Sequence, residues 1–216
     1  MISGDSRAFL IDILPMLLSL GELVFLKVSY VMRVLVKGGG FRAFWYCLGA
    51  LKHFPNHEIF AYSSGSLAGV VHVCSDLGVE DIVQAASELL EHVHLGMLFD
   101  CIQKFLWKVL AEDAFVRANA CLHIVLSYPL MAFAGRVIDN WQCNQELIET
   151  VVASCMIPFV TAPLPWHPSS FAVDGGLAWN VRLNIPSIEL PSSELKLTSI
   201  TRSESHALLS GSCLPW

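Results

Sequence analysis

The chain has 216 residues, of which 54% are hydrophobic and only 15% charged, and its mean hydropathy is +0.56. Soluble domains carry roughly 25% charged residues, so this composition predicts exposed apolar surface or membrane contact. The formal net charge of −6, without any basic cluster, argues against nucleic acid and leaves lipid as the better partner.

The length predicts one domain that can bury a core without disulfides. Seven cysteines lie singly in apolar segments with no CxxC pair, which indicates reduced thiols and a reducing, cytoplasmic compartment. They are Cys47, Cys74, Cys101, Cys121, Cys143, Cys155 and Cys213. His92 and His94 point in different directions on a helix and have no acidic or cysteine partner beside them, so we expect no metal. No cofactor is indicated.

Residues 1–31 form an apolar segment that we expect to be helical. Its interruptions by Asp12, Pro15, Gly21, Glu22 and Lys27 fit neither a transmembrane span of about 20 apolar residues nor a signal peptide. The segment is therefore predicted to pack on the domain or to lie in a membrane interface, as a peripheral attachment. A single N-terminal membrane anchor is the alternative.

A strand predicted over residues 32–37 runs into three glycines, and a helix follows to about residue 53. Glycines allow positive φ and bring N–H groups close to an anion, and the helix start adds positive potential. A simple tight turn is the alternative, and Arg42 could either stabilise charge or pair structurally with a carboxylate. The residues of this loop are Gly38, Gly39, Gly40, Phe41, Arg42 and Ala43.

A second strand, from residue 59, ends at Ser63, and a helix follows to about Cys74. This pattern is typical of a nucleophile elbow, in which a serine is held on a sharp turn between strand and helix. Ala61 and Gly65 supply the small flanking residues. Ser63 could instead cap the helix, and Ser64 and Ser66 are nearby alternatives as the nucleophile.

The next segments complete an α/β pattern. Residues 79–118 are predicted to be helical and to cap the site, residues 121–127 to form a central strand, and a turn to fall near residues 139–140. A helix over 144–156 would be capped by Asn144 and ended by Pro158. Repeated strand, turn and helix units indicate an α/β fold with a mainly parallel sheet flanked by helices.

A fourth apolar strand, residues 171–174, ends in Asp174 and is followed by Gly175 and Gly176. Such an aspartate could accept a proton from a nearby hydroxyl, although it could also be a turn or helix-capping residue. Residues 185–216 are predicted to be an irregular C-terminal tail.

The ordered set of Gly-Gly-Gly-Phe-Arg-Ala, Ala-Tyr-Ser-Ser-Gly and Asp-Gly-Gly resembles the patatin-like phospholipase family over residues 32–184. The resemblance includes residues 153–158 ahead of the aspartate strand. Ala43 and Ala61 stand where the family's pattern has glycine.

The resemblance implies a patatin-like fold and a lipid acyl hydrolase that cleaves carboxylic esters of phospholipids or other glycerolipids at a membrane or lipid-droplet surface. Ser63 would be the nucleophile and Asp174 the general base. The oxyanion hole would come from Gly38, Gly39, Gly40, Phe41 and Arg42, with Ala43, Ala61, Gly65, Gly175 and Gly176 supporting the motifs.

Two alternatives remain from the sequence. The two alanines could mark a catalytically impaired lipid-binding protein. Alternatively, the order of Ser63, Asp174 and His206 along the chain is that of an α/β-hydrolase triad. The polar sequence around His206, with no strand before it, favours the dyad.

Overall fold

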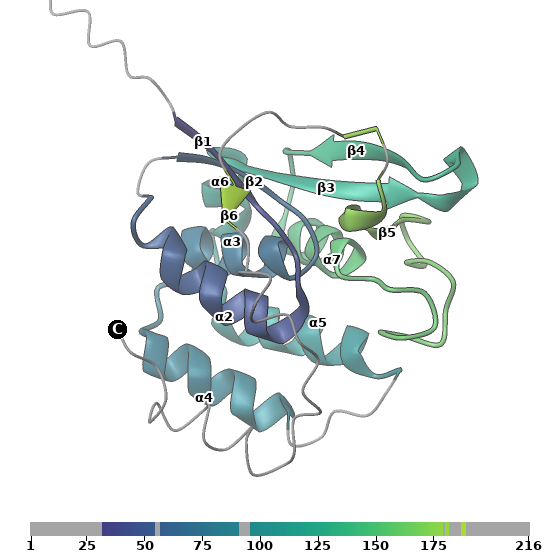
Figure 1. Ribbon diagram of the computed structural model, residues 1–216. Helices are drawn as coiled ribbons and strands as arrows, with labels where there is room; N and C mark the ends of the chain where they lie inside the picture. The colour runs from purple at the N-terminus through teal and green to yellow at the C-terminus, as the bar shows by residue number, and fades with distance from the viewer. Residues whose placement is uncertain (1–31, 55–56, 91–95, 179, 182–186, 189–216) are drawn as a thin grey trace, which may run out of the picture. The chain divides into compact units, whose positions relative to one another are not determined.

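The computed structural model describes residues 32–54, 57–90, 96–178, 180–181 and 187–188 (Figure 1). This part of the chain is a mixed α/β fold with a six-stranded, mostly parallel sheet. The strand order is β4-β3-β2-β1-β6, and β5 pairs with β3. The α/β class and the mainly parallel sheet that the sequence predicted are therefore confirmed.

The strands are β1 (Met32–Val36), β2 (His57–Ala61), β3 (Leu122–Tyr128), β4 (Ala134–Ile138), β5 (Val173–Asp174) and β6 (Ser187–Ile188). The helices are α2 (Gly40–Leu51), α3 (Ser64–Cys74), α4 (Val79–Leu90), α5 (Leu98–Val109), α6 (Ala114–Asn119) and α7 (Asn144–Ser154). Two short 3₁₀ turns complete the set, η1 (Pro129–Met131) and η2 (Gly175–Leu177).

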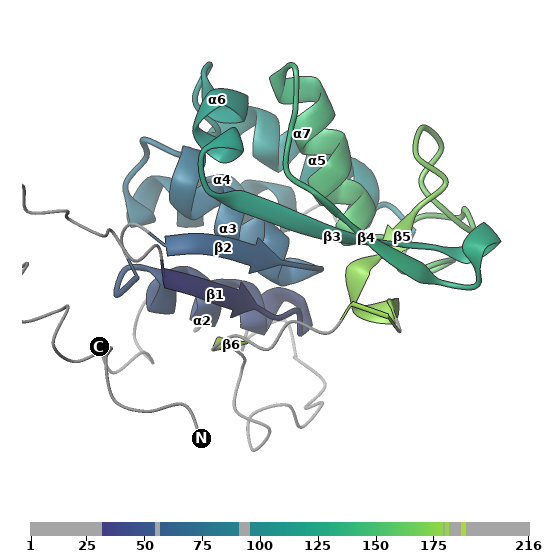
Figure 2. The same ribbon diagram turned by 90° about the horizontal axis from the view of Figure 1, so that it is seen from above.

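The core lies between the sheet and the helices, and α2, α3 and α7 lie on one face of the sheet (Figures 1 and 2). Side chains alternate between the two faces of a strand. Accordingly, Val34 and Val36 of β1 and Ile59 and Ala61 of β2 are buried, whereas the residues between them are half-buried. Alternating apolar residues therefore fix which face of the sheet the helices cover.

The helical stretch predicted over residues 79–118 is divided into three helices, α4, α5 and α6. Helix α4 packs on α5, α5 packs on α7, and α6 packs on α3 and α7. Their predicted role as a cap over the site is not tested by these contacts and stays a prediction.

The end of the sheet differs from the expectation in three places. The hairpin of β3 and β4 was not predicted, and β5 is short and antiparallel to β3. Within the segment predicted to be an irregular tail, Ser187 and Ile188 form β6, which pairs in parallel with β1. This pairing gives β1 a hydrogen-bonded partner on the edge that β2 does not occupy.

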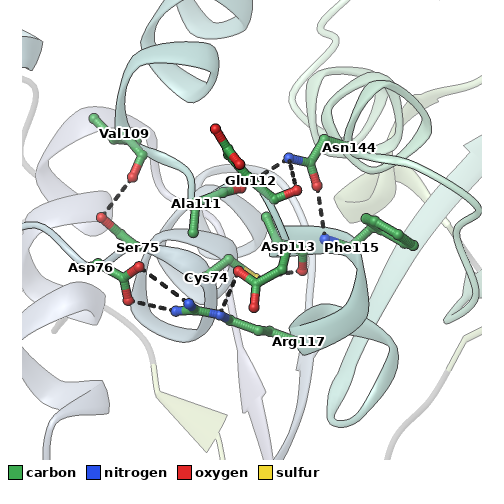
Figure 3. Close-up of polar contacts among 11 residues, drawn as sticks. Cys74, Ser75, Asp76, Val109, Ala111, Glu112, Asp113, Phe115, Arg117 and Asn144 are labelled. Carbon is green, nitrogen blue, oxygen red and sulfur yellow. Dashed lines mark hydrogen bonds and ion pairs between the residues drawn. The ribbon is translucent and has the colours of Figure 1, made fainter.

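The predicted cap at Asn144 is wrong. Helix α7 begins at Asn144, and the position before it, Cys143, makes no capping hydrogen bond through its side chain. The Asn144 amide instead joins α7 to the α5–α6 connection, because it accepts from the Phe115 N–H at 2.9 Å and donates to the Ala111 carbonyl at 2.9 Å (Figure 3). The Asn144 side chain therefore makes long-range hydrogen bonds instead of capping its own helix.

Several predictions fall outside the described residues. These are the apolar segment 1–31, the two histidines His92 and His94, the tail from residue 189 with His206, and Cys213. Within the described part of the chain, no helix has both the length and the hydropathy that a membrane span requires.

Candidate functional site

The register of β1 and β2 brings the glycine loop next to Ser63. The two strands are parallel, with Val36 opposite Ala61. Gly38 and Ser63 each lie two residues beyond this pair. They are therefore neighbours at the carboxyl ends of the two strands. A Cβ atom built on Gly38 would lie 2.4 Å from the Ser63 Cβ and 2.8 Å from its Oγ. Only glycine fits at this position.

The register of β3 brings Asp174 to the same place. β2 pairs with the first half of β3, where Ala61 lies opposite Ile124. β4 occupies the other edge of β3, so β5 must lie on the β2 side, with Asp174 opposite Leu126. The end of β5 therefore lies next to the end of β2 along β3, and Asp174 faces the turn that follows β2.

Ser63 has the geometry expected of a nucleophile elbow. Its φ is 55° and its ψ is −139°, a region that residues with a Cβ rarely adopt. Such strain costs on the order of 1–3 kcal/mol and is concentrated at functional sites. Ser63 occupies the N-cap position of α3, but its side chain makes no capping bond and its hydroxyl instead donates to the Asp174 carboxylate. The helix-capping alternative is therefore wrong for the Ser63 side chain.

Asp174 is a buried carboxylate, with 6% of its surface exposed. Its Oδ1 accepts from the Gly176 N–H at 2.7 Å, so Asp174 also caps η2. Burial raises the pKa of Asp174 above the usual aspartate value, because burial disfavours the charged form. The hydrogen bonds from Ser63 and Gly176 oppose this shift without cancelling it. The carboxylate is therefore a stronger base than a solvated aspartate.

Two further glycines lie where the chain passes closest to its neighbours. A Cβ on Gly65 would lie 2.3 Å from the Val36 carbonyl oxygen, and one on Gly175 would lie 2.1 Å from that of Val125. These contacts confirm the packing reason for the glycine two residues after Ser63. Gly176 is less restricted, since its nearest neighbour would be Asp174 Oδ1 at 3.0 Å.

The residues proposed for an oxyanion hole separate into different environments. Gly38 touches Ser63, whereas the Gly39 N–H donates to the Ser64 hydroxyl at 3.1 Å. Gly40, Phe41 and Arg42 form the exposed first turn of α2. The first N–H groups of a helix have no partner within it, and here the starts of α2 and α3 both lie beside Ser63. Positive potential from two helix ends therefore reaches this point.

Two hydroxyls hold the backbone of Ser63, and the sequence did not indicate a role for one of them, that of Ser154. The Ser63 N–H donates to Ser154 Oγ at 3.0 Å, and Ser154 in turn donates to the Val125 carbonyl at 2.9 Å. The Ser66 hydroxyl donates to the Ser63 carbonyl at 2.7 Å. Ser64 and Ser66 therefore support the turn, although the sequence allowed either as a nucleophile. The one signal in the sequence for Ser154 is that a small polar residue stands at the end of a helix whose neighbouring residues are apolar.

The two alanines that replace motif glycines are both fully buried, Ala43 in α2 and Ala61 in β2. Gly69 of α3 passes over Ala61, and a Cβ on Gly69 would lie 3.8 Å from the Ala61 Cβ. Helix α3 therefore has a glycine, Gly69, at the point where it packs against Ala61.

The six described cysteines are free, and burial raises the pKa of Cys47 to about 11 and of Cys74 to about 12. Cys155 Sγ lies 3.9 Å from Ser66 Oγ, and burial followed by the Asp174 charge raises the pKa of Cys155 as well. The thiols of Cys47, Cys74 and Cys155 are therefore protonated near neutral pH, and all three pack as small buried hydrophobes. Among the described residues, no three His, Cys, Asp or Glu side chains gather closely enough to hold a metal ion.

A separate cavity of about 190 Å³ lies between α5, α7 and the 157–171 loop, and Phe99, Glu149 and His167 help to line it. Neither Ser63 nor Asp174 lines this cavity. It is smaller than the roughly 300–1,000 Å³ of typical ligand pockets, and we assign it no role.

Compared with models of known protein families, the sequence matches none, and a search among curated proteins also gives no match. The class of protein therefore rests on the chain itself. It is an α/β domain with a serine on a strained strand-to-helix turn, hydrogen-bonded to a buried aspartate.

Proposed function

We propose that this protein is a patatin-like lipid acyl hydrolase that cleaves carboxylic ester bonds of phospholipids or other glycerolipids. The observation that carries the proposal is that the Ser63 hydroxyl, held on a strained strand-to-helix turn, interacts with the buried Asp174 carboxylate. A serine hydroxyl is a weak nucleophile unless a base lies within hydrogen-bond reach. Here the base is an aspartate whose pKa is raised by burial, which favours proton transfer.

In the first half of the reaction, Ser63 Oγ attacks the ester carbonyl carbon as its proton passes to Asp174. The carbonyl oxygen becomes an oxyanion, which the nearby N–H groups of the glycine loop and helix starts would stabilise. The tetrahedral intermediate then expels the alcohol, which takes the proton from Asp174. An acyl-serine remains.

In the second half, Asp174 accepts a proton from water, and the resulting hydroxide adds to the acyl carbon. Collapse of this intermediate returns the proton to Ser63 and releases the fatty acid. Both halves use the same two side chains, so one buried carboxylate serves in turn as base and acid. The low charge and high hydropathy of the chain favour a lipid ester over a water-soluble one.

The test is release of fatty acid from a panel of phospholipids and neutral glycerolipids, measured by mass spectrometry for the parent protein and for Ser63→Ala. A matched control is Ser170→Ala, because Ser170 contacts the His167 ring rather than the Ser63–Asp174 pair. We expect release by the parent and by Ser170→Ala, and none above background by Ser63→Ala. Equal release by the Ser63→Ala protein would refute the proposal.

A further inference from the structure

Large hydrophobic side chains are exposed on two loops at one end of the sheet. We call these loops, residues 129–133 and 157–171, the apolar rim. Eight of the seventeen exposed large hydrophobic side chains in the described part of the chain belong to it. Leu130 is 72% exposed and Phe159 is 67% exposed. The rim therefore concentrates apolar surface that the core does not use.

The rim borders the Ser63–Asp174 pair. One loop follows β3, whose residue Leu126 lies opposite Asp174. The other loop begins just after Met156, whose carbonyl accepts from the Asp174 N–H at 2.9 Å, and it returns to β5. Both views place these loops at the end of the sheet toward which the arrows of β1, β2 and β3 point (Figures 1 and 2). The candidate catalytic pair opens at the same end.

The rim carries no full charge. Neither residues 129–135 nor residues 157–173 contain an aspartate, glutamate, lysine or arginine. Burial lowers the pKa of His167, so this histidine stays neutral near pH 7. The nearest cation along the hairpin, Arg136, lies against the Met131 sulfur at 3.5 Å and the Tyr128 ring at 5.3 Å. Exposed loops in water are seldom so free of charge.

The aromatic residues of the rim are held in unusual backbone conformations. Phe133, Phe159 and Phe171 all have positive φ, between 54° and 63°. Backbone hydrogen bonds fix these turns, from Phe133 N–H to the Tyr128 carbonyl and from Phe159 N–H to the Leu164 carbonyl. A bulky residue in this region is strained, and strain of this kind is concentrated where side chains contact ligands. These turns expose phenylalanine at positions whose positive φ asparagine or aspartate would adopt with less strain.

We propose that the apolar rim inserts into the boundary between head groups and acyl chains of a zwitterionic phospholipid surface. This inference rests on the proposed function, which supplies the reason for a lipid rather than a protein partner. Insertion would place Ser63 where the ester bonds of the lipid lie, so a substrate need not leave the surface. An uncharged rim on a chain of net charge −6 gains nothing from anionic lipid. Binding should therefore resist salt.

The experiment measures flotation of the full-length Ser63→Ala protein with phosphatidylcholine vesicles, so that binding is read without turnover. The rim variant is Leu130→Asp with Phe159→Asp. Both sites are exposed, and aspartate tolerates the positive φ of residue 159 better than most residues. The control variant, Trp107→Asp with Val116→Asp, removes two side chains that are also half or more exposed.

The control residues lie away from the rim. Val116 belongs to α6, which leads into the start of β3, about 20 Å along that strand from the hairpin. Trp107 is near the end of α5, where Val109 accepts from Ser75, the residue just after α3. Far-ultraviolet circular dichroism and melting curves establish that both variants remain folded.

We expect the parent to float with the vesicles, the rim variant to lose at least about tenfold in partitioning, and the control variant to stay within about twofold. Raising the salt from 0.1 to 0.5 M should change parental binding by less than about twofold. A parent that does not float, or a rim variant that floats as well as the control, overturns the inference. So does a rim variant that changes the oligomeric state instead, because the rim would then contact a second copy.

The same rim substitutions in a protein that retains Ser63 separate this inference from the proposed function. Hydrolysis of a soluble short-chain ester should stay within about twofold of the parent, because the rim does not touch the reacting atoms. If vesicle binding depends on the rim but no ester is cleaved, the docking surface stands and the proposed function fails. If esters are cleaved but binding ignores the rim, the proposed function stands and the docking surface fails.

Discussion

The Ser154 hydroxyl accepts a hydrogen bond from the Ser63 N–H at 3.0 Å and donates one to the Val125 carbonyl at 2.9 Å. It thereby ties the strained turn after β2 to the adjacent strand β3 through the end of α7. Ser154 is completely buried, so no water can replace it easily. The backbone conformation that presents Ser63 therefore depends on a residue 91 positions away in the sequence.

Replacing Ser154 by alanine should leave two backbone groups without a partner. We expect a loss of about 1–3 kcal/mol in the free energy of unfolding, as is typical of unsatisfied buried groups. The nucleophile would also be less well placed, and kcat should fall by roughly tenfold to a hundredfold. Denaturant unfolding and ester hydrolysis measure the two effects.

A matched control is Ser127→Ala. The Ser127 hydroxyl is also fully buried, but among the described residues it has no hydrogen-bond partner. Its removal should leave stability unchanged or improve it, because an unsatisfied polar group is lost. If both alanine variants behave alike, the bond from Ser154 to Ser63 has no special role.

Ser64 should support the site without being the nucleophile. Its hydroxyl accepts from the Gly39 N–H, so Ser64→Ala should loosen the glycine loop and lower kcat by roughly tenfold. A fluorophosphonate probe should still label the Ser64→Ala protein, and peptide mapping should place the label on Ser63. A label on Ser64 of the parent protein would instead make Ser64 the nucleophile.

Two neighbouring glycines should respond differently to alanine. Gly38→Ala would bring a methyl group within 2.8 Å of Ser63 Oγ, and we expect kcat to fall by about a hundredfold or more. Gly40→Ala meets nothing within 4 Å but forces alanine to φ +72°, which costs about 1–2 kcal/mol of stability. Gly38→Ala should therefore lose activity, whereas Gly40→Ala should mainly have a lower melting temperature. The reverse result would mean that the loop does not contact the reacting centre.

Replacing Ser63, Asp174 and His206 one at a time distinguishes a dyad from a triad. In a dyad, Ser63→Ala and Asp174→Asn should each approach background, and their losses should not add because the pair acts as one unit. His206→Ala should stay within about threefold of the parent, since it makes no transition-state contact. The readout is kcat on one soluble ester. A His206→Ala enzyme as inactive as Ser63→Ala would make His206 the base, with a loss of about 10⁴–10⁶ in kcat expected by analogy with triad enzymes.

Ionisation of Asp174 as the pH rises should increase activity and decrease the stability of the fold. As the proposed general base it must be ionised, so kcat/KM should fall as the pH drops through its pKa, which burial raises above the ordinary value of about 3.9. The same raised pKa means that the folded state binds a proton more tightly than the unfolded state. Ionised Asp174 therefore destabilises the fold at pH values above its folded pKa.

Asp174→Asn should accordingly be inactive but melt at a higher temperature than the parent at pH 7. The gain should shrink as the pH falls through the folded pKa of Asp174, because the parental aspartate is then neutral too. Melting curves at several pH values measure this. A lower melting temperature for Asp174→Asn at pH 7 would show that hydrogen bonds to the carboxylate outweigh its burial.

Local patterns in the sequence were enough for the α/β class and for the strands and turns that carry the site. Glycines after β1, small residues around Ser63 and a glycine pair after Asp174 each reflect a local steric need, and the close contacts at Gly38, Gly65 and Gly175 give the reason. Such needs act over a few residues, so they can be inferred without the fold.

The meeting of Ser63 with Asp174 was decided only by the tertiary structure. It follows from the edge of β3 that β2 and β5 share, which brings together two residues more than a hundred positions apart in the sequence. The same holds for the Ser154 bond to Ser63 and for Asn144, whose local capping pattern was outcompeted by partners in the α5–α6 connection. A local pattern specifies what a side chain can bond, but chain packing selects the partner, because a buried polar group must use whichever partner the fold brings within reach.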